Sequence, residues 1–443
     1  MIIPSKLITE INSLGLSCKK TAIAIDICGD ICKRCIYLEK FVPINKKYYT
    51  KVIGTSGILE IIKKLLTVGI IERDYYKPNE KSYHYRIAKN YNDFLFHKTR
   101  NVNLKKLQEK QKRENRKEFN KLPDYLRRMA KRIREVEFHI EKIKDWINTY
   151  TPSENELEIK NEKRKQKGKT QITMEVYTAK LRESMLFSLA NVEHGNWTFH
   201  RDGTVLRLHT NITNMKTALL KKSQTKLVEI DVKNSQPFML NILLDLCDIH
   251  NKHKNKELTN TTNNTTPYND VMFPLFNIAG QLVKQDFSFI NGLLLAPSFY
   301  DEVVVFSNIT SNGGFYEYFQ ADSKIDRDMV KVMMYQILFS KNESYIKSKT
   351  IFRNKFPMIC KFVEWVKRDE HNQLSIILSK IESYIMIDVL CKRLDEAGII
   401  PITKHDSILI APEQEKCAVQ IFKDVFMETC RCIPSFEIKP LND

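Results

Sequence analysis

The sequence predicts an α+β fold, and three observations indicate it. Two apolar runs of strand type carry Asp231 and Asp406, which lie far apart in the chain. Between them, polar and aromatic side chains recur at steps of four, the spacing that places them on one stripe of a helix. Near the amino terminus, a further helical pattern precedes two strand-type runs. The chain has 443 residues and 42% hydrophobic content, enough to bury a sizeable core in two or three domains.

Residues 1–100 are predicted to form an amino-terminal domain. Residues 48–66 indicate a short strand or turn followed by an amphipathic helix, and residues 68–88 indicate two strands joined by a Lys-Pro-Asn-Glu turn. A helix followed by a hairpin with a basic tip is similar to a winged-helix domain, whose recognition helix enters the major groove of DNA. Winged helices also bind proteins, so both kinds of partner stay open.

The same region contains closely spaced cysteines. Cys28, Cys32 and Cys35 have the spacing of a metal cluster, which is also that of radical-SAM proteins, and Cys18 lies nearby. The surrounding sequence is also that of an apolar helix on which small cysteines pack, and this is the interpretation we favour. The ten cysteines are irregularly placed without a secretion signal, so we expect no disulfide framework.

Residues 101–194 are predicted to be a long basic helical arm and linker. Residues 101–170 contain 21 Lys and Arg against 12 Asp and Glu, which is half of the net charge of +18. Apolar spacing predicts one helix from about Pro123 to Thr149, and residues 162–171 are expected to be a flexible linker. A thumb-like arm that follows duplex phosphates and a solvated interdomain helix both stay open.

The residues of the carboxy-terminal region, 195–443, indicate templated nucleotidyl transfer. This chemistry uses two divalent ions about 3.5–4 Å apart, held by carboxylates that converge from neighbouring strands. Asp231 and Asp406 are the candidates. A triphosphate needs cations along one helix face, and a base pair needs a stacking surface. One helical stripe offers both, in the order Arg327, Lys331, Tyr335 and Phe339.

In order and spacing, these residues resemble the motifs of family A DNA polymerases and of the related single-subunit phage and mitochondrial RNA polymerases. The first motif is an aspartate that ends a strand. The second is an arginine, a lysine four residues later, and aromatics four and eight residues beyond the lysine. The third is His-Asp followed by Glu or Ser, matched by His405, Asp406 and Ser407. The resemblance covers about residues 195–440. Ser340 departs from it, because the family usually has glycine there.

The resemblance implies a right-hand palm and fingers and a role for each matched residue. It implies that two Mg²⁺ ions bind the two aspartates, that the helix cations bind the triphosphate, and that the helix aromatics contact the nascent base pair. It also implies candidate nucleic-acid contacts: His405 at the primer terminus, Glu382 facing the primer–template, and Asp202 and Arg207 in a segment loosely similar to one that RNA polymerases set against the template. A surface glutamate is the simpler interpretation of Glu382.

Sugar choice depends on three positions. Gln236, the fifth residue after Asp231, stands where the DNA enzymes have a bulky glutamate and the RNA enzymes glycine. Phe339 lacks the phenolic hydroxyl that helps the RNA enzymes recognise a 2′-hydroxyl. Both favour deoxynucleotides, whereas Ser407 favours ribonucleotides. We therefore expect a DNA-dependent DNA polymerase that uses dNTPs on a DNA primer–template. A single-subunit RNA polymerase or primase using NTPs is the alternative, and an RNA template stays open.

Composition is consistent with this expectation. A net charge of +18 favours a polyanionic partner. No run of about 18 apolar residues predicts a membrane span, and the first ten residues match neither a secretory nor a transit peptide. We expect a cytoplasmic protein, encoded by a mobile element, phage or plasmid. A second alternative is a non-catalytic winged-helix replication initiator.

Overall fold

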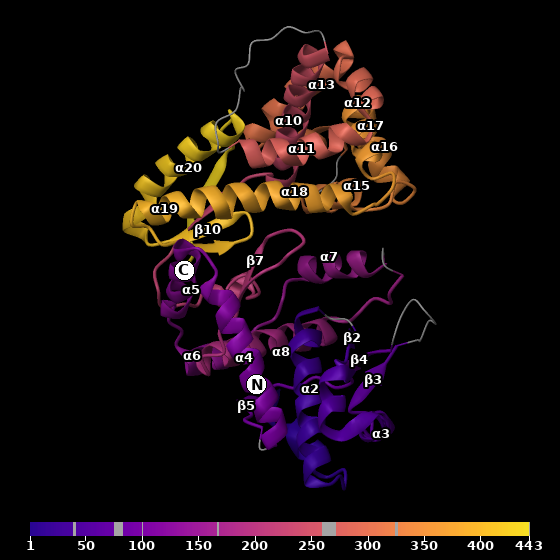
Figure 1. The fold of residues 1–443 in the computed structure, drawn as a ribbon, viewed down its shortest axis with the longest axis vertical. Helices are drawn as coiled ribbons and strands as arrows, with labels where there is room; N and C mark the ends of the chain where they lie inside the picture. The colour runs from indigo at the N-terminus through magenta and orange to yellow at the C-terminus, as the bar shows by residue number, and fades with distance from the viewer. Residues whose placement is uncertain are drawn as a thin grey trace. The chain divides into compact units, whose positions relative to one another are not determined.

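The computed structural model describes residues 1–38, 41–74, 83–99, 101–165, 168–258, 272–323 and 327–442. It confirms the α+β class, with many helices and small sheets (Figure 1). The chain divides into two compact units. The first contains Met1–Phe199 and Thr210–Thr225, and the second contains His200–His209 and Lys226–Asp443. The division falls in the hairpin of β6 (Phe199–Arg201) and β7 (Leu208–Thr210).

The elements of the first unit follow one another in short segments. In chain order they are β1 (Ile2–Pro4), α1 (Ser5–Asn12), α2 (Cys18–Leu38), β2 (Val42–Pro43), α3 (Lys46–Thr67), β3 (Ile71–Arg73), β4 (His84–Ile87), β5 (Phe94–Phe96), α4 (Val102–Asn120), α5 (Asp124–Arg132), a 3₁₀ turn (Ile133–Glu135), α6 (Ile140–Thr149), α7 (Glu154–Lys165), α8 (Met174–Glu193) and α9 (Thr217–Leu220).

In the amino-terminal part of this unit, α2 and the kinked helix α3 pack against a small sheet. The sheet has the order β2-β4-β3 and is antiparallel, and the strands predicted within 68–88 are β3 and β4. The predicted turn between them lies outside the described residues. Apolar residues of α1, α2, α3 and these strands form one buried core.

The prediction for the start of α3 was wrong. Helix begins already at Lys46, because the side chain of Asn45 caps it by accepting from the Tyr48 N–H. Gly54, with φ of +72°, then bends the chain between two helical halves. This left-handed backbone conformation favours glycine. Capping and packing overcome the strand preference of the tyrosines, threonine and valine in this stretch.

The apolar helix with cysteines is confirmed as α2. Cys28 and Cys32 are not in a disulfide and lie fully buried in the core of the first unit. The side chain of Cys35 lies outside the described set. These two cysteines therefore pack as small apolar residues.

The basic arm is not one helix from 123 to 149. It divides into α5, the 3₁₀ turn and α6, and α4 and α7 are further helices of the region. The interruption has a tertiary cause: Phe138 forms an antiparallel bridge with Ser223, and the Glu137 carbonyl accepts from the Gln224 N–H at 2.8 Å. The predicted linker also begins as helix, because α7 extends to Lys165.

The second unit contains a four-stranded antiparallel sheet and many helices. The elements are β8 (Val228–Val232), α10 (Ser235–Leu258), α11 (Phe273–Gln285), α12 (Phe287–Leu294), α13 (Pro297–Ser311), α14 (Phe315–Ser323), α15 (Arg327–Phe339), α16 (Ile346–Lys355), α17 (Pro357–Val366), α18 (Gln373–Ser383), a π-helical segment (Tyr384–Cys391), α19 (Lys392–Glu396), β9 (Ile402–Lys404), β10 (Ser407–Ile410), a 3₁₀ turn (Pro412–Gln414), α20 (Glu415–Cys430) and β11 (Phe436–Pro440). The sheet order is β11-β8-β10-β9.

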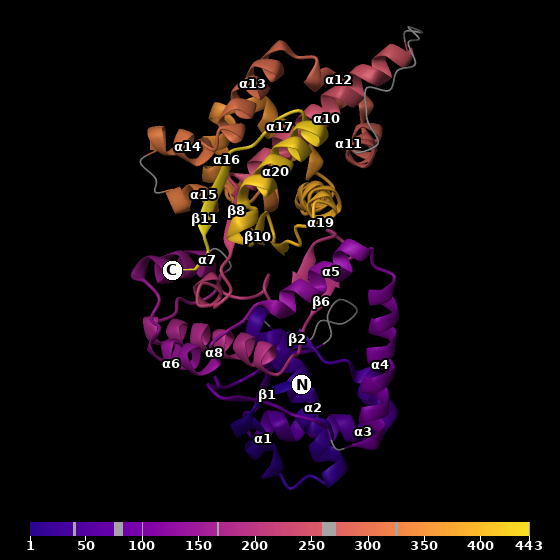
Figure 2. The same ribbon diagram turned by 90° about the vertical axis from the view of Figure 1, so that its left-hand side faces the viewer.

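The side chains on one face of this sheet are apolar and form part of the core of the second unit. Val228, Ile230 and Val232 alternate along β8 and are buried. Phe436 of β11 packs against α20, and its ring centroid lies 5.2 Å from that of Phe422. Figure 2 shows α20 beside β8 and β11. The opposite face of the sheet is therefore left for polar side chains.

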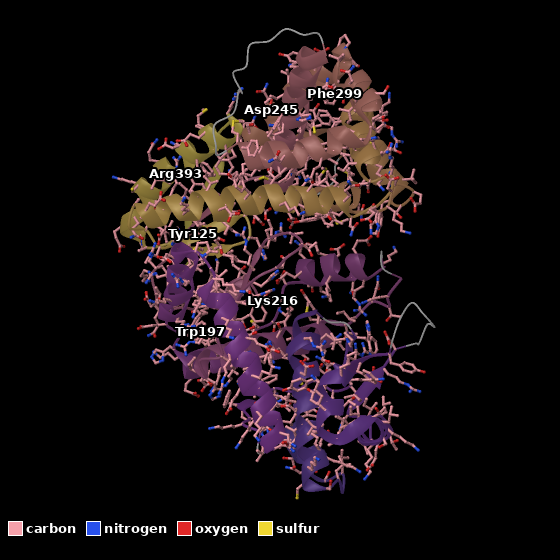
Figure 3. All side chains as sticks on the ribbon, in the orientation of Figure 1. Tyr125, Trp197, Lys216, Asp245, Phe299 and Arg393 are labelled. Carbon is pink, nitrogen blue, oxygen red and sulfur yellow. The ribbon has the colours of Figure 1, made fainter. Side chains whose placement is uncertain are left out.

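The predicted amphipathic helix that precedes His405 is present, and Gly398 follows it with φ of +76°. Figure 1 shows α18 and α19 as parts of one long rod, and the π-helical segment lies between them. Arg393, labelled in Figure 3, joins α19 to α20 through its ion pair with Glu428 at 2.9 Å. π-Helical segments are rare in proteins and often occur near functional residues.

No single helix within the described ranges is both long enough and apolar enough to cross a membrane. One pair of helices, 288–294 with 297–311, meets the same criterion of length and composition only when taken together, and a bend of 70° separates its two members.

Candidate active site

Strand pairing brings the two predicted aspartates together. Asp231 of β8 lies opposite Ser407 of β10, and Asp406 immediately precedes Ser407. The Val232 N–H donates to the Asp406 carbonyl at 3.4 Å. The two aspartates thus lie next to each other at the same end of the two central strands, although most of the second unit separates them in sequence.

A tight turn presents Asp406. His405 and Asp406 form the two-residue connection between β9 and β10, whose flanking residues Lys404 and Ser407 are paired. His405 has φ of +59°, a left-handed conformation that is uncommon for a residue with a side chain. Strained backbone of this kind is concentrated at functional sites. The turn leaves the His405 side chain exposed.

Polar residues follow the same face of the sheet as Asp231. Glu229, two residues earlier on β8, is only 5% exposed. Its carboxylate accepts from the Ser407 hydroxyl at 2.9 Å and from the Lys404 ammonium at 3.3 Å. Burial, and then the charges of Asp406 and Glu229, raise the pKa of Asp231 to about 7. Burial also raises the pKa of Asp406.

Helix α15 presents the second predicted group on its accessible side. Tyr335 is 54% exposed, and Arg327, Lys331 and Phe339 lie on the same side. The opposite side of the helix packs into the core through Val330, Val332, Met333, Met334, Ile337 and Leu338. The aromatics are therefore available for contact, and the rings of Tyr335 and Phe339 lie 5.6 Å apart.

The two cations of α15 are held by the preceding helix. Arg327 pairs with Glu317 of α14 at 2.8 Å, and both Arg327 and Lys331 lie over the ring of Tyr316, at 5.2 and 5.8 Å. Such cation–π contacts orient long side chains. Burial raises the pKa of Tyr316, and the charge of Asp406 adds to this increase. The negative charge of Asp406 therefore acts on Tyr316, the ring that lies beneath the two cations of α15.

Two buried lysines hold the other end of α15. The Lys349 ammonium donates to the Ser344 carbonyl at 2.6 Å and to the Ser340 hydroxyl at 3.0 Å. Lys367 donates to the Ser340 carbonyl at 3.1 Å, and to that of Ile337. The last carbonyls of a helix lack intrahelical partners and carry partial negative charge, so cations stabilise them. Burial, and then Lys349, lowers the pKa of Lys367 to about 8.

One cavity of about 430 Å³ gathers most of the predicted residues. Its wall comes from α10, α15, α18, the β9–β10 turn and the chain before β7. The lining residues are Arg207, Gln236, Tyr335, Phe339, Ser375, Ser379, Glu382, His405 and Asp406. Asp231 lies on the adjoining strand. Arg327, Lys331 and Asp202 are not part of the cavity wall.

Glu382 lies in the cavity wall and is only 2% exposed, so its interpretation as a surface residue was wrong. Its carboxylate pairs with Arg207 at 2.7 Å and accepts from the Gln236 amide at 2.5 Å and from the Ser235 hydroxyl at 3.4 Å. Burial raises the pKa of Glu382, and Arg207 opposes this increase. Glu382 therefore positions both the arginine and the glutamine.

Two polar atoms of this network have no partner within the described part of the chain. They are the Arg207 Nε and the Gln236 Oε1, and both are buried. Buried polar atoms are nearly always hydrogen-bonded, so an unmatched donor and acceptor beside a cavity indicate a polar ligand.

The segment before β7 is fixed to the long helical rod. Asp202 accepts from the N–H groups of Thr204 and Val205, both at 2.7 Å, and so organises a turn. Arg201 pairs with Asp388 of the π-helical segment, at 2.7 and 2.6 Å. These contacts position Arg207 in the cavity wall. Asp202 therefore stabilises the turn before β7.

Sequence reasoning missed several residues of the site. Glu229 had a usable signal, because it precedes Asp231 by two residues and alternation places both on one face. The buried Lys349 and Lys367 had none, since charged residues are expected on the surface. Ser407 was interpreted as a motif residue and as a signal of sugar choice, whereas its hydroxyl is bound to Glu229.

The oxygen donors present are compatible with Mg²⁺. Among the described residues, no group of three or more His, Cys, Asp or Glu side chains could hold a metal ion. Asp231 and Asp406 nevertheless provide carboxylate oxygens, and their mutual repulsion is one cause of the raised pKa of Asp231. A divalent cation relieves such repulsion, and Mg²⁺ commonly uses one or two carboxylates, with water and phosphate oxygens as its other ligands.

Comparisons with known proteins found similarity among solved structures alone. No protein-family model matches the chain, and no curated protein matches it. Among solved structures, it is similar to the POL domain of Pol1 from M. smegmatis in complex with DNA primer-template and dNTP, with 12% sequence identity and a TM-score of 0.29. The match covers 60% of this chain and 51% of that one, so the chain spans about half the length of the solved domain.

Proposed function

We propose that the protein is a template-directed nucleotidyltransferase, a DNA polymerase of family A type of the kind that a mobile element, phage or plasmid encodes. The cavity of about 430 Å³ is the observation that carries this proposal. Residues from five separate segments meet there, and an aspartate pair adjoins it. If the motifs resembled those of polymerases only by chance, their residues would have no reason to meet at one cavity.

Each side chain has a task that its position supports. Tyr335 and Phe339 offer aromatic faces against which a nascent base pair stacks. Arg327 and Lys331 sit two turns and one turn earlier on α15, where they bind the triphosphate. His405, exposed at the tip of its turn, contacts the phosphate at the primer terminus. Catalysis consists of positioning and charge neutralisation.

Asp231 and Asp406 hold the divalent ions in this proposal. When bound there, Mg²⁺ supplies activation of the primer 3′-hydroxyl and neutralisation of the triphosphate charge. The carboxylates fix the place where this happens, because the β9–β10 turn and the pairing of β8 with β10 leave them little freedom.

Sugar selection is assigned to the glutamine beside the aromatics. Gln236 is tied to Glu382, which holds its side chain in the cavity wall near Phe339. A fixed, bulky side chain there disfavours a 2′-hydroxyl. Ser407 gives no support for ribonucleotides, since its hydroxyl is bound to Glu229. The proposal is therefore DNA synthesis from dNTPs.

The first 100 residues are proposed to bind duplex DNA as a winged-helix-like domain. The kinked α3 followed by β3 and β4, with β2 on the other side of β4, supports this proposal. Thr55, Ser56 and Leu59 are exposed at the start of the second helical half, where a recognition helix contacts base edges. The basic helices of residues 101–194 are proposed to contact the duplex backbone.

Single-nucleotide primer extension tests the proposal. The wild-type protein is expected to extend a DNA primer on a DNA template with Mg²⁺, using a dNTP at least tenfold more efficiently than the matching NTP. Gln236→Gly is expected to reduce this preference, and Glu413→Gln, an exposed carboxylate elsewhere in the second unit, serves as the matched control. Extension only with NTPs would replace the DNA polymerase by an RNA polymerase or primase. Absence of extension with either nucleotide contradicts the proposal.

A further inference from the structure

A second cavity lies entirely within the first unit. Its volume is about 720 Å³, which is within the range of roughly 300–1,000 Å³ that is typical of ligand pockets. Residues of α2, the start of α3, the segment after β5 and α4 line it. No residue of the candidate active site takes part, so the cavity needs its own explanation.

A buried carboxylate lies in the wall of this cavity. Asp26 of α2 is only 4% exposed. It accepts from the Gln108 amide at 3.0 Å and from the Tyr49 hydroxyl. Within the described residues Asp26 has no ion-pair partner. A carboxylate has about four acceptor positions, so Asp26 keeps capacity for further donors.

Positive charge surrounds the same cavity. Lys33 extends from α2, Lys98 follows β5, and Lys105 and Lys112 lie on the cavity side of α4. All four are exposed, and none forms an ion pair with any residue that the structure describes. The wall also contains Glu109 and Asp30, and Asp30 pairs with Arg34 at 2.7 Å. The four lysines still outnumber the carboxylates of the wall, and this excess of positive charge favours an anionic ligand.

Aromatic surface is also present. Tyr48 is half-buried in the cavity wall, and the side chain of Phe96 is 46% exposed beside it. An exposed phenylalanine at a cavity mouth is suited to stacking a flat ring, and base–aromatic stacking contributes about 1–3 kcal/mol per base. The cavity thus combines an acceptor, cations and a stacking surface.

We propose that this cavity binds a nucleotide, and that guanine is the preferred base. The phosphate lies toward Lys105 and Lys112, the base stacks on the aromatic surface, and its Watson–Crick edge reaches Asp26. Guanine presents two adjacent donors on that edge, N1–H and the amino group, which match the two carboxylate oxygens. A free nucleotide and the unpaired end of a DNA strand share this chemistry.

Equilibrium binding to the full-length protein tests the proposal. The probes are fluorescent GMP, fluorescent IMP and a 5′-phosphorylated single-stranded oligonucleotide ending in guanine, all in EDTA and at low salt. Lys105→Ala/Lys112→Ala is expected to weaken GMP binding about tenfold. Lys106→Ala/Lys110→Ala removes the same charge from the same helix outside the cavity, and it is expected to change binding less than twofold.

The role of Asp26 has a separate readout. IMP lacks the amino group, so the wild-type protein is expected to bind GMP at least fivefold more tightly than IMP, and Asp26→Asn is expected to lose this preference while still binding through the lysines. Lys331→Ala, in the candidate active site, is expected to leave GMP binding unchanged. Tighter binding of the oligonucleotide than of GMP identifies a strand end as the ligand, and equal binding identifies a free nucleotide.

Three results would overturn the inference. They are no saturable binding of any of the three probes, equal weakening of GMP binding by the two lysine-pair variants, and loss of GMP binding in Lys331→Ala. The last result would show that the nucleotide binds in the candidate active site instead. Because these tests measure binding and not primer extension, failure of this inference is distinguishable from failure of the proposed polymerase function.

Discussion

Replacing Asp231 by asparagine is expected to stabilise the protein above neutral pH. The folded protein raises the pKa of Asp231 from its usual value of 3.8 to about 7, through burial and the charges of Asp406 and Glu229. Between these two pH values the folded state binds more protons than the unfolded state. The free energy of unfolding therefore falls as the pH rises through this window.

The magnitude follows from the size of that change. A pKa that moves from 3.8 to about 7 corresponds to about 4 kcal/mol. Asp231 remains partly exposed, so solvent screening reduces this to roughly 2 kcal/mol. Asparagine keeps the shape and removes the charge. Near pH 8, the free energy of unfolding of Asp231→Asn is thus expected to exceed that of wild type by roughly 2 kcal/mol. Near pH 5 this difference should be less than half as large.

Tryptophan fluorescence during urea titration measures this effect. In a Trp146→Phe/Trp197→Phe background, Trp365 of α17 is the one remaining tryptophan, and it reports unfolding of the second unit. Titrations in EDTA at both pH values give the comparison, and Glu413→Gln is the control for loss of an exposed charge. An Asp231→Asn protein that is less stable near pH 8, or equally stabilised at both pH values, would refute the electrostatic reasoning.

Three further outcomes are expected. Arg207→Met removes the ion-pair partner of the buried Glu382, so it should lower the free energy of unfolding by about 3 kcal/mol in urea titration. Adding Glu382→Gln should restore most of that loss. Equal stability of Arg207→Met and wild type would contradict the pairing. Lys349→Met leaves carbonyls beyond the end of α15 without a donor and should cost about 3 kcal/mol by thermal unfolding, whereas the exposed Lys347→Met should cost less than about 0.5 kcal/mol; similar losses would show that the buried ammonium is not needed. Lys331→Ala should raise KM for the triphosphate about tenfold or more in steady-state extension, and an unchanged kcat/KM would remove the lysine from triphosphate binding.

Much of the second unit followed from local patterns in the sequence. The apolar run around Asp231 predicted a strand, and the step of four on α15 predicted a common side for Tyr335 and Phe339. Both patterns arise from backbone geometry, which acts over a few residues. The structure agrees with both: the run forms β8, and the buried side chains of α15 lie on the side of the helix opposite Tyr335.

Long-range contacts explain the differences. The interruption before α6 depends on Ser223, which lies far along the chain from its partner Phe138, and no local periodicity contains this information. Glu382 lies on an amphipathic helix where exposure was the simpler expectation, yet Arg207 and Gln236 converge on it from distant segments. A buried charge is recognisable only once its partners are placed.

Single-turnover incorporation of one dNTP tests most directly whether the aspartate pair is a catalytic unit. Wild type, Asp231→Asn, Asp406→Asn and the double variant are compared on the same primer–template with Mg²⁺. If both carboxylates hold the same ions, each single change should lower the rate at least about 10³-fold, and the double variant should be scarcely slower than either single variant. A rate close to wild type in either single variant, or independent losses that multiply in the double variant, would contradict the account.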